Sequence, residues 1–133
     1  MRQITFRLLP GQDLKQEIEQ KIKDNKISAG CIASVVGGLQ TAVLRMAGSG
    51  PDSQYIKTFT GPFEIVAGTG TLSPDKCHIH LAMSDREGLV IGGHLKDGCI
   101  VAYTAEITLL IFDDANFRRG PDSATGFDEL IVN

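Results

Sequence analysis

The chain has 133 residues, of which 42% are hydrophobic and 22% charged, and its formal net charge is −3 at pH 7 with neutral histidines. This length suits a single domain, residues 1–133, and roughly two thirds of the surface of an unfolded chain of this size can be buried on folding. The composition excludes a disordered or fibrous protein. The acidic balance argues against a broad cationic surface for nucleic acid, because binding to phosphate backbones draws its affinity from clustered Lys and Arg.

The N-terminal segment predicts a strand followed by a helix. Residues 3–9 alternate apolar and polar side chains as in a half-buried strand, and Pro10-Gly11 ends the alternation. Asp13 is a suitable N-cap for a helix at about residues 12–25. Its apolar side chains repeat every fourth position along one face, at Leu14, Ile18 and Ile22. Because this stripe is narrow, we expect the helix to lie on a sheet.

No segment has the character of a targeting or membrane sequence. Residues 1–7 alternate in polarity, and no later stretch approaches the ~20 apolar residues of a membrane span. We therefore expect a cytoplasmic protein without membrane contact. The cysteines are odd in number and well separated, which predicts buried free thiols in strands rather than disulfides or a thiolate zinc site. They are Cys31, Cys77 and Cys99.

From about residue 30 almost to its end, the sequence is typical of strands, with β-branched runs punctuated by glycine. The expected strands are 31–36, 39–46, 55–59, 63–72, 77–83, 89–91 and 100–112. One early helix and about seven strands predict an α+β fold with a mostly antiparallel sheet. The last stretch is apolar on both faces, and one helix can cover only one of them. A second layer or another subunit must cover the other face, which predicts an oligomer.

The only compact basic sequence is Arg118-Arg119-Gly120-Pro121, which we expect in a loop. Its order differs from the Arg-Gly-Arg-Pro core of an AT-hook, which threads the minor groove of DNA, and no flanking basic run follows. We interpret it as a loop whose arginines pair with nearby acids, with a DNA contact as the alternative.

All three histidines lie between positions 78 and 94. On a strand, His78 and His80 project from the same face, because side chains alternate with a period of two. Residues 84–89 predict a turn, with Gly88 supplying a positive φ. If the paired positions on its two sides sum to an even number, His80 opposes His94 and all three rings share a face; if the sum is odd, His94 points away. Three neutral imidazoles with an open fourth position suit zinc, and nickel or copper would also accept them.

Other interpretations of this cluster remain open. His78 and His80 could be exposed strand residues while His94 caps a loop, or the histidines could bind a carboxylate or phosphate directly. The adjoining Gly92 and Gly93 would let backbone and metal approach closely.

Two lone acids in uncharged strand stretches, Glu64 and Glu106, are the candidate catalytic residues. Either could accept an imidazole N–H or act as general base for metal-bound water. The structural alternative is an ion pair with Arg7 or Arg45, since buried charges are usually paired.

Taken together, the motifs resemble the PPC domain family, the plants and prokaryotes conserved domain, over nearly the whole chain. The matching motifs are Phe6-Arg7-Leu8, Pro10-Gly11, Asp13-Leu14, Gly61-Pro62-Phe63-Glu64-Ile65, Gly70-Thr71-Leu72-Ser73, His78-Ile79-His80, Ser84-Asp85, Gly88, Gly92-Gly93-His94-Leu95, Gly98-Cys99-Ile100-Val101 and Thr104-Ala105-Glu106. The resemblance implies a homotrimer of antiparallel sheets with one packed helix and metal ligands at positions 78, 80 and 94. Stand-alone prokaryotic members are described as DNA-binding proteins. In plant relatives an AT-hook outside this domain contacts DNA, and this chain has no such hook.

Three classes of function follow. The first is a trimeric metal-binding module associated with DNA or transcription. The second is a zinc-dependent enzyme acting on a small molecule, with Glu64 or Glu106 as base. The third is a sensor of a small anionic ligand. The family resemblance favours the first, whereas the acidic charge and an open coordination position favour the other two.

Overall fold

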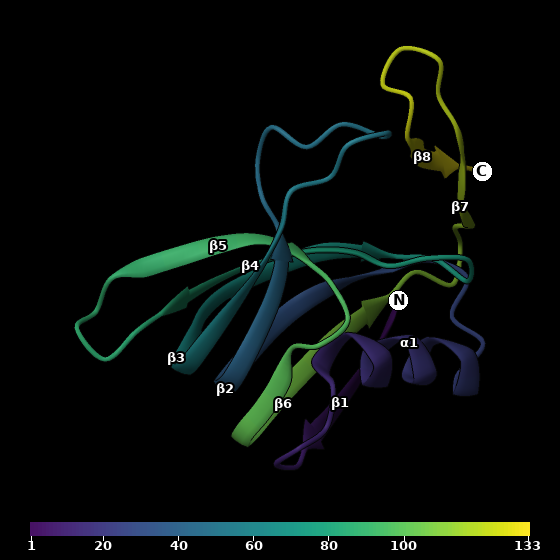
Figure 1. Cartoon of the computed structure of the whole chain (residues 1–133). Helices are drawn as coiled ribbons and strands as arrows, with labels where there is room; N and C mark the ends of the chain where they lie inside the picture. Colours follow the sequence, from purple (N-terminus) through teal and green to yellow (C-terminus); the bar gives the residue numbers. More distant parts are fainter.

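Two antiparallel sheets and one short helix make up the computed structural model, which describes residues 1–133 (Figure 1). The elements in chain order are β1 (Arg2–Leu8), α1 (Leu14–Asp24), β2 (Gly30–Arg45), β3 (Ile56–Leu72), β4 (His78–Ser84), β5 (Val90–Leu95), β6 (Ile100–Ile111), β7 (Phe117–Pro121) and β8 (Asp128–Val132). Six strands form the main sheet in the order β1-β6-β2-β3-β4-β5, and β7 pairs with β8 separately. The predicted α+β class with a mostly antiparallel sheet is confirmed.

The structure has eight strands rather than about seven: the hairpin strands β7 and β8 were not predicted, and two pairs of predicted strands are continuous because glycine does not end strands here. β2 runs through Gly37-Gly38 and joins two predicted strands, and β3 runs through Gly61 in the same way. At Gly37, where φ is +151°, a Cβ would overlap the carbonyl oxygen of Thr104 on β6. The glycine therefore allows a neighbouring strand to come close, and the ladder continues past it.

The expected loop at Arg118–Pro121 is also wrong, since these residues form most of β7. Arg119 lies opposite Leu130 of β8, and Asn116 and Asn133 exchange two backbone hydrogen bonds at the open end of the hairpin. The apolar residues of β8 supply the strand character that Arg-Arg-Gly-Pro lacks. Because side chains alternate along a strand, Arg118 and Arg119 point to opposite sides of the hairpin and do not form one basic spot.

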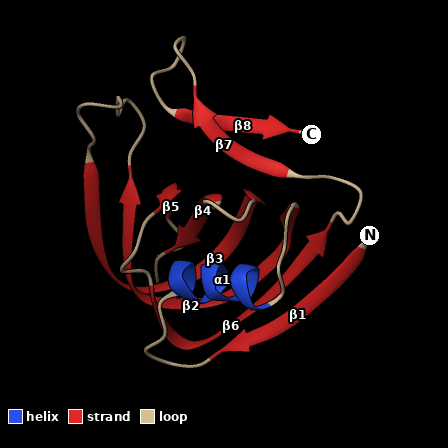
Figure 2. Cartoon of the chain, turned by 90° about the vertical axis from the view of Figure 1, so that its right-hand side faces the viewer, coloured by secondary structure: helices blue, strands red, loops and turns tan.

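The core lies between α1 and the concave side of the main sheet, which curves around the helix (Figure 2). Asp13 caps the helix as predicted, accepting hydrogen bonds from Lys15 N at 3.0 Å and Gln16 N at 3.2 Å. The predicted apolar stripe of Leu14, Ile18 and Ile22 is buried against the sheet. Each such side chain contributes about 1.5–3 kcal/mol through burial. No helix has the length and apolar character needed to cross a membrane.

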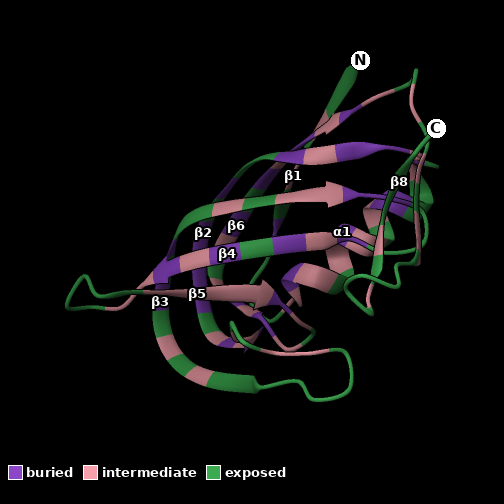
Figure 3. Ribbon diagram, turned by 90° about the horizontal axis from the view of Figure 1, so that it is seen from above, coloured by how far each residue is buried: buried purple, intermediate pink, exposed green.

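The opposite side of the main sheet has no helix over it, and buried residues alternate with more exposed ones along the strands (Figure 3). On β2, Val35 is buried towards the helix, while Val36 is 51% exposed on the other side. Val66 on β3 is 53% exposed. Within one chain, the second cover that the sequence predicted for this face is not supplied.

The C-terminal end of β2 pairs with β5 in addition to its neighbour β3. Leu44 lies opposite Leu95, and Arg45 lies opposite His94. This pairing requires Gly93, where a Cβ would lie 2.8 Å from the Arg45 carbonyl oxygen. On the other side of β5, a Cβ on Gly92 would overlap the Leu81 carbonyl oxygen of β4. The two glycines therefore allow the backbones of β4, β5 and β2 to meet closely around His94.

Candidate metal centre

The three histidines lie on one face because the β4–β5 register is the even one. His80 is the direct partner of His94. The turn between the strands forms as predicted: Asp85 accepts hydrogen bonds from Glu87 N and Leu89 N, and Gly88 has a φ of +82°. The three imidazoles therefore share one face of the sheet, which the sequence predicted for an even register.

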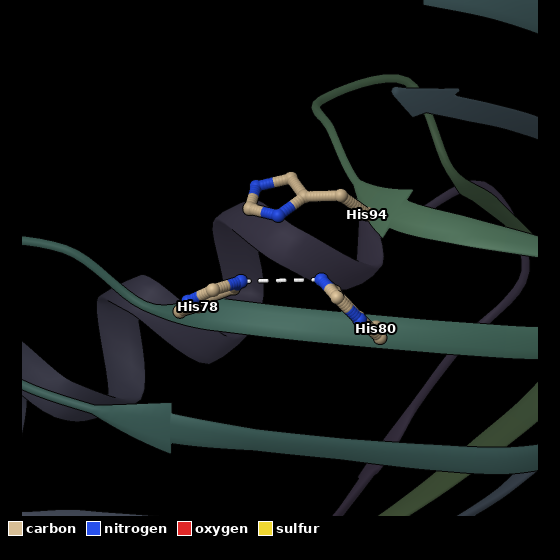
Figure 4. Close-up of side chains that lie close together, drawn as sticks. All are labelled: His78, His80 and His94. Atoms are coloured by element: carbon tan, nitrogen blue, oxygen red, sulfur yellow. Dashed lines mark hydrogen bonds between the residues drawn. The ribbon is translucent and has the colours of Figure 1, made fainter. Parts of the chain in front are cut away.

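The imidazole rings converge on a common point (Figure 4). The Nε2 atoms of His78 and His80 are 3.1 Å apart, and one ring nitrogen from each of the three residues lies within 4.8 Å of the others. A tetrahedral zinc ion with Zn–N bonds of ~2.0–2.1 Å holds its ligand nitrogens roughly 3.3–3.4 Å apart. The His78–His80 separation is close to that value. A neutral three-imidazole donor set therefore fits zinc, and also nickel or copper.

The surroundings keep two of the rings neutral. Burial lowers the pKa of His94 to about 3, and the Arg45 guanidinium acts in the same direction. Burial and the positive charge of Arg119 lower the pKa of His78. Nη2 of Arg45 lies 3.3 Å from Nδ1 of His94, and because a guanidinium only donates, Nδ1 is the acceptor; a metal ion bound through Nδ1 would replace this hydrogen bond. A neutral imidazole has the free lone pair that a metal ion needs, so these rings are suited to bind metal at neutral pH.

A polar pocket opens beside the cluster, between the ends of β2, β4 and β5 and the β7–β8 hairpin. It encloses about 600 Å³, part of it open to solvent. Its lining includes four cationic and two acidic side chains: Arg45, Lys76, Lys96, Arg119, Asp128 and Glu129. The sequence analysis did not assign these residues to the site. Two of them carried a local signal: Arg45 was one alternative ion-pair partner of Glu64 or Glu106, and Arg119 belonged to the basic sequence expected to pair with acids or, alternatively, to contact DNA.

Neither predicted catalytic glutamate lies at the cluster. Glu64 pairs with Ser84, four positions along β4 from His80 and so ~13 Å away at ~3.3 Å per residue. Glu106 lies opposite Arg7 and Val36 on the other side of β2. Neither residue lines the pocket. The structure therefore does not bring Glu64 or Glu106 to the histidines, and the carboxylates found there belong to Asp128 and Glu129.

The cysteines are free, as expected, and lie outside the histidine cluster, although Cys77 lines the pocket beside it. Cys77 and Cys99 are buried, and Cys31 is partly buried. Burial raises the pKa of the Cys77 thiol to about 12 and that of Cys99 to about 11. The group of side chains whose ligand atoms lie within 4.8 Å of one another consists of the three histidines and contains no cysteine.

Comparison with curated proteins finds two cyanobacterial relatives. The chain is 45% identical over 132 residues to a bifunctional protein GlmU of Synechococcus sp. strain JA-3-3Ab, and 44% identical over 127 residues to that of strain JA-2-3B'a(2-13). The alignments cover 99% and 96% of this chain. The chain spans only about a fifth of the length of these relatives, 21% and 20% respectively.

Solved structures of similar fold cover the whole chain. A hypothetical protein from Salmonella enterica is 35% identical, with a TM-score of 0.93 over 99% of this chain and 93% of that one. A metal-containing protein from Archaeoglobus fulgidus is 27% identical, with a TM-score of 0.85 over 98% and 94%. A protein from Ralstonia eutropha, named a putative DNA-binding protein, is 20% identical with a TM-score of 0.85 over 97% and 90%, and shows the fold alone.

The family assignment rests on the sequence as well as the fold. The family model of the Plants and Prokaryotes Conserved (PCC) domain matches residues 1–113. This segment contains the main sheet, α1 and all three histidines, and leaves the β7–β8 hairpin outside it. The resemblance seen in the motifs is confirmed, and the chain belongs to the Plants and Prokaryotes Conserved domain family.

Proposed function

We propose that His78, His80 and His94 hold one divalent transition metal ion, zinc in the first place, and that the chain is a metal-binding module. The observation that carries the proposal is the convergence of three imidazoles from two paired strands, with one nitrogen of each within 4.8 Å of the others. The relative from Archaeoglobus fulgidus, named as metal-containing, supports it at 27% identity. A zinc ion held by three histidines supplies a Lewis acid with an open coordination position.

Metal analysis of protein purified without an affinity tag tests this proposal. We expect about one metal ion per chain after dialysis against trace zinc, and at least ~100-fold weaker metal binding in His78→Ala. Ser84→Ala is the matched control, because Ser84 lies on the same face of β4 at its far end. Wild-type protein without metal, or equal metal binding by His78→Ala, contradicts the proposal.

We further propose that the module is a homotrimer. A sheet face without cover and with exposed apolar side chains supports self-association, since a sheet needs a second layer over an apolar face. The number three comes from the family resemblance. The histidines lie on this same side of the sheet, because His78 and His80 alternate along β4 with the core residues Ile79 and Leu81, so the proposed contact adjoins the histidine site and leaves α1 outside it.

A DNA-binding or transcription-associated role is the second candidate. Two proteins of the same fold, from Bacteroides thetaiotaomicron and Ralstonia eutropha, are named putative DNA-binding proteins, at 18% and 20% identity. A gel shift at two salt concentrations tests it. Binding that weakens steeply with salt supports the role, and no shift even at low salt removes it, because the electrostatic attraction to phosphate is strongest there.

An enzyme or sensor acting on a small anionic ligand is the alternative. The observation that favours it is the cationic pocket beside the histidines. A catalytic version of this alternative requires a base other than Glu64 or Glu106, which lie away from the pocket.

A further inference from the structure

The cationic side chains around the histidine cluster have no acidic partners. Arg45, Lys76, Lys96 and Arg119 all line the pocket, yet none forms a salt bridge within 4.0 Å. The salt bridges of the chain involve Met1, Arg2 and Lys15 instead. Lys76 is exposed, whereas Arg45, Lys96 and Arg119 are partly buried, and partly buried charges are normally paired, so these three unpaired cations in one pocket indicate a site for an anion.

Arg119 is held in place from two directions. Its backbone N donates to Oδ2 of Asp75 at 3.4 Å, and its Nη2 donates to Oγ1 of Thr71 at 2.6 Å. Thr71 is the strand partner of His78, so this bond holds the guanidinium beside the cluster. The Nε–H of Arg119 is shielded from solvent and has no acceptor. An unsatisfied sheltered donor is costly unless a ligand accepts from it.

Arg45 approaches the cluster next to a different histidine. Its Nη2 atom is 3.3 Å from His94 Nδ1, and its guanidinium lies 5.1 Å from the ring centre of Phe127. The aromatic ring stabilises the arginine in this position through a cation–π contact. One guanidinium thus lies by His94 and another by His78.

A metal ion would add further positive charge between these arginines. Zinc bound to three neutral imidazoles keeps its full charge of two, and cations held this close repel one another unless an anion lies between them. Asp128 and Glu129 line the same pocket but leave all four cationic side chains unpaired. The charge balance therefore favours an anionic ligand over a neutral one.

We propose that the pocket binds a small oxyanion, the carboxylate or phosphate group of a small metabolite, with one oxygen on the metal and the others hydrogen-bonded to Arg119 and Arg45. The inference rests on the proposed metal centre and names the ligand class of that site. Guanidinium groups bind carboxylate and phosphate through two parallel hydrogen bonds. Only two of the eleven lining residues are hydrophobic, which suits a small polar ligand.

The β7–β8 hairpin supplies one wall of the pocket, and His78 and His94 of the proposed metal centre line it as well. Arg119, Phe127, Asp128 and Glu129 all belong to the hairpin and its loop, which lie outside the matched residues 1–113. The histidines and Arg45 lie inside them. The hairpin thus adds Arg119 to a site whose histidines and Arg45 lie in the matched segment, and replacing Arg119 tests anion binding without changing a proposed metal ligand.

Isothermal titration of the metal-loaded protein, with inorganic phosphate and malonate as probes, tests the inference. We expect saturable binding of at least one probe at one site per chain, and the tighter probe identifies which oxyanion the pocket prefers. Arg119→Ala should weaken this binding ~10- to 100-fold, the loss expected for a hydrogen bond to a charged group. Arg118→Ala is the matched control, because it removes the neighbouring arginine from the other side of β7 and should leave the affinity unchanged.

Metal content measured on the same samples separates the two proposals. Wild-type protein that holds its metal but binds neither probe overturns the anion site and leaves the metal centre intact. Protein that takes up no metal overturns the metal centre, and the inference with it. If Arg119→Ala lowers the melting temperature, the variant Arg119→Lys is measured instead. Lysine cannot form the two parallel hydrogen bonds of a guanidinium, so anion binding should still weaken. Equal weakening by Arg118→Ala overturns the assignment to Arg119.

Discussion

At the scale of single residues, the histidines are distinguished by their protonation. A surface imidazole titrates near pH 6.5 and is partly charged in a mildly acidic medium. Burial, with Arg45 close by, lowers the pKa of His94 to about 3. The folded protein therefore keeps this ring neutral under conditions in which the unfolded chain protonates it.

This difference predicts an acid-sensitive stability for the metal-free protein. Because the unfolded state binds the extra proton, the stability associated with His94 is complete above pH ~6.5 and decreases as the pH falls towards 3. Replacing the residue, in His94→Gln, should make the free energy of unfolding fall less steeply between pH 6.5 and 5. Urea denaturation in the presence of a chelator, repeated over this range, measures both slopes. Equal slopes would show that His94 titrates alike in the folded and unfolded states.

At the scale of elements, the site depends on how closely β5 lies between β4 and β2. His94 faces His80 through the first pairing and Arg45 through the second. Both pairings require a strand without side chains at Gly92 and Gly93. The sequence suggested that these glycines let backbone and metal approach closely. In the structure they allow the backbones of the neighbouring strands β4 and β2 to approach β5.

Gly93→Ala should disturb this arrangement. The added methyl would lie 2.8 Å from the Arg45 carbonyl oxygen and 3.2 Å from the Leu44 Cβ, so β5 must move away from β2. We expect a loss of about 1–3 kcal/mol in stability, as for other overpacked sites, together with weaker metal binding. Gly50→Ala is the control, because a Cβ there meets nothing within 4 Å and its φ is not positive. Thermal denaturation and zinc titration of both variants provide the comparison, and unchanged metal affinity in Gly93→Ala would count against the dependence on β5.

At the scale of the whole molecule, the helix covers one side of the main sheet, and the β7–β8 hairpin reaches only the histidine end of the other (Figure 1). The helix fills the concave side, whereas Val36 and Val66 are about half exposed on the other. Apolar side chains on an open sheet face favour association with a second copy, as proposed above. These exposed valines are the observation on which the proposed association rests.

Charged residues on this face should separate the subunits. Light scattering coupled to size exclusion should give three chain masses for the wild type and a lower mass for the double variant Val36→Glu and Val66→Glu, because an unpaired charge is costly to bury in a contact. Leu9→Glu serves as the control, since Leu9 is equally exposed, at 52%, but lies in the turn after β1. A wild type that runs as one chain mass would refute the trimer.

The parts of this protein that could be predicted from the sequence are those in which the signal and its consequence are close along the chain. The apolar stripe of α1, its cap at Asp13 and the shared face of His78 and His80 follow from local periodicity. The turn after Ser84 similarly predicted a strand pairing that brings His94 to the same face, provided that the paired positions sum to an even number. The family motifs belong to this group, since each is a short run of residues.

The remaining features come from contacts between segments that are distant in sequence. Glycine continues β2 because of its contact with β6, and Arg-Arg-Gly-Pro becomes a strand because β8 pairs with it. Arg45 and Arg119 reach the histidines only through the β2–β5 pairing and the hairpin, while Glu64 and Glu106 are carried away along their strands. Local patterns determine which face a side chain occupies and where a helix begins. Which strands become neighbours depends on the packing of the whole chain, and this packing surrounds the histidines with unpaired cations.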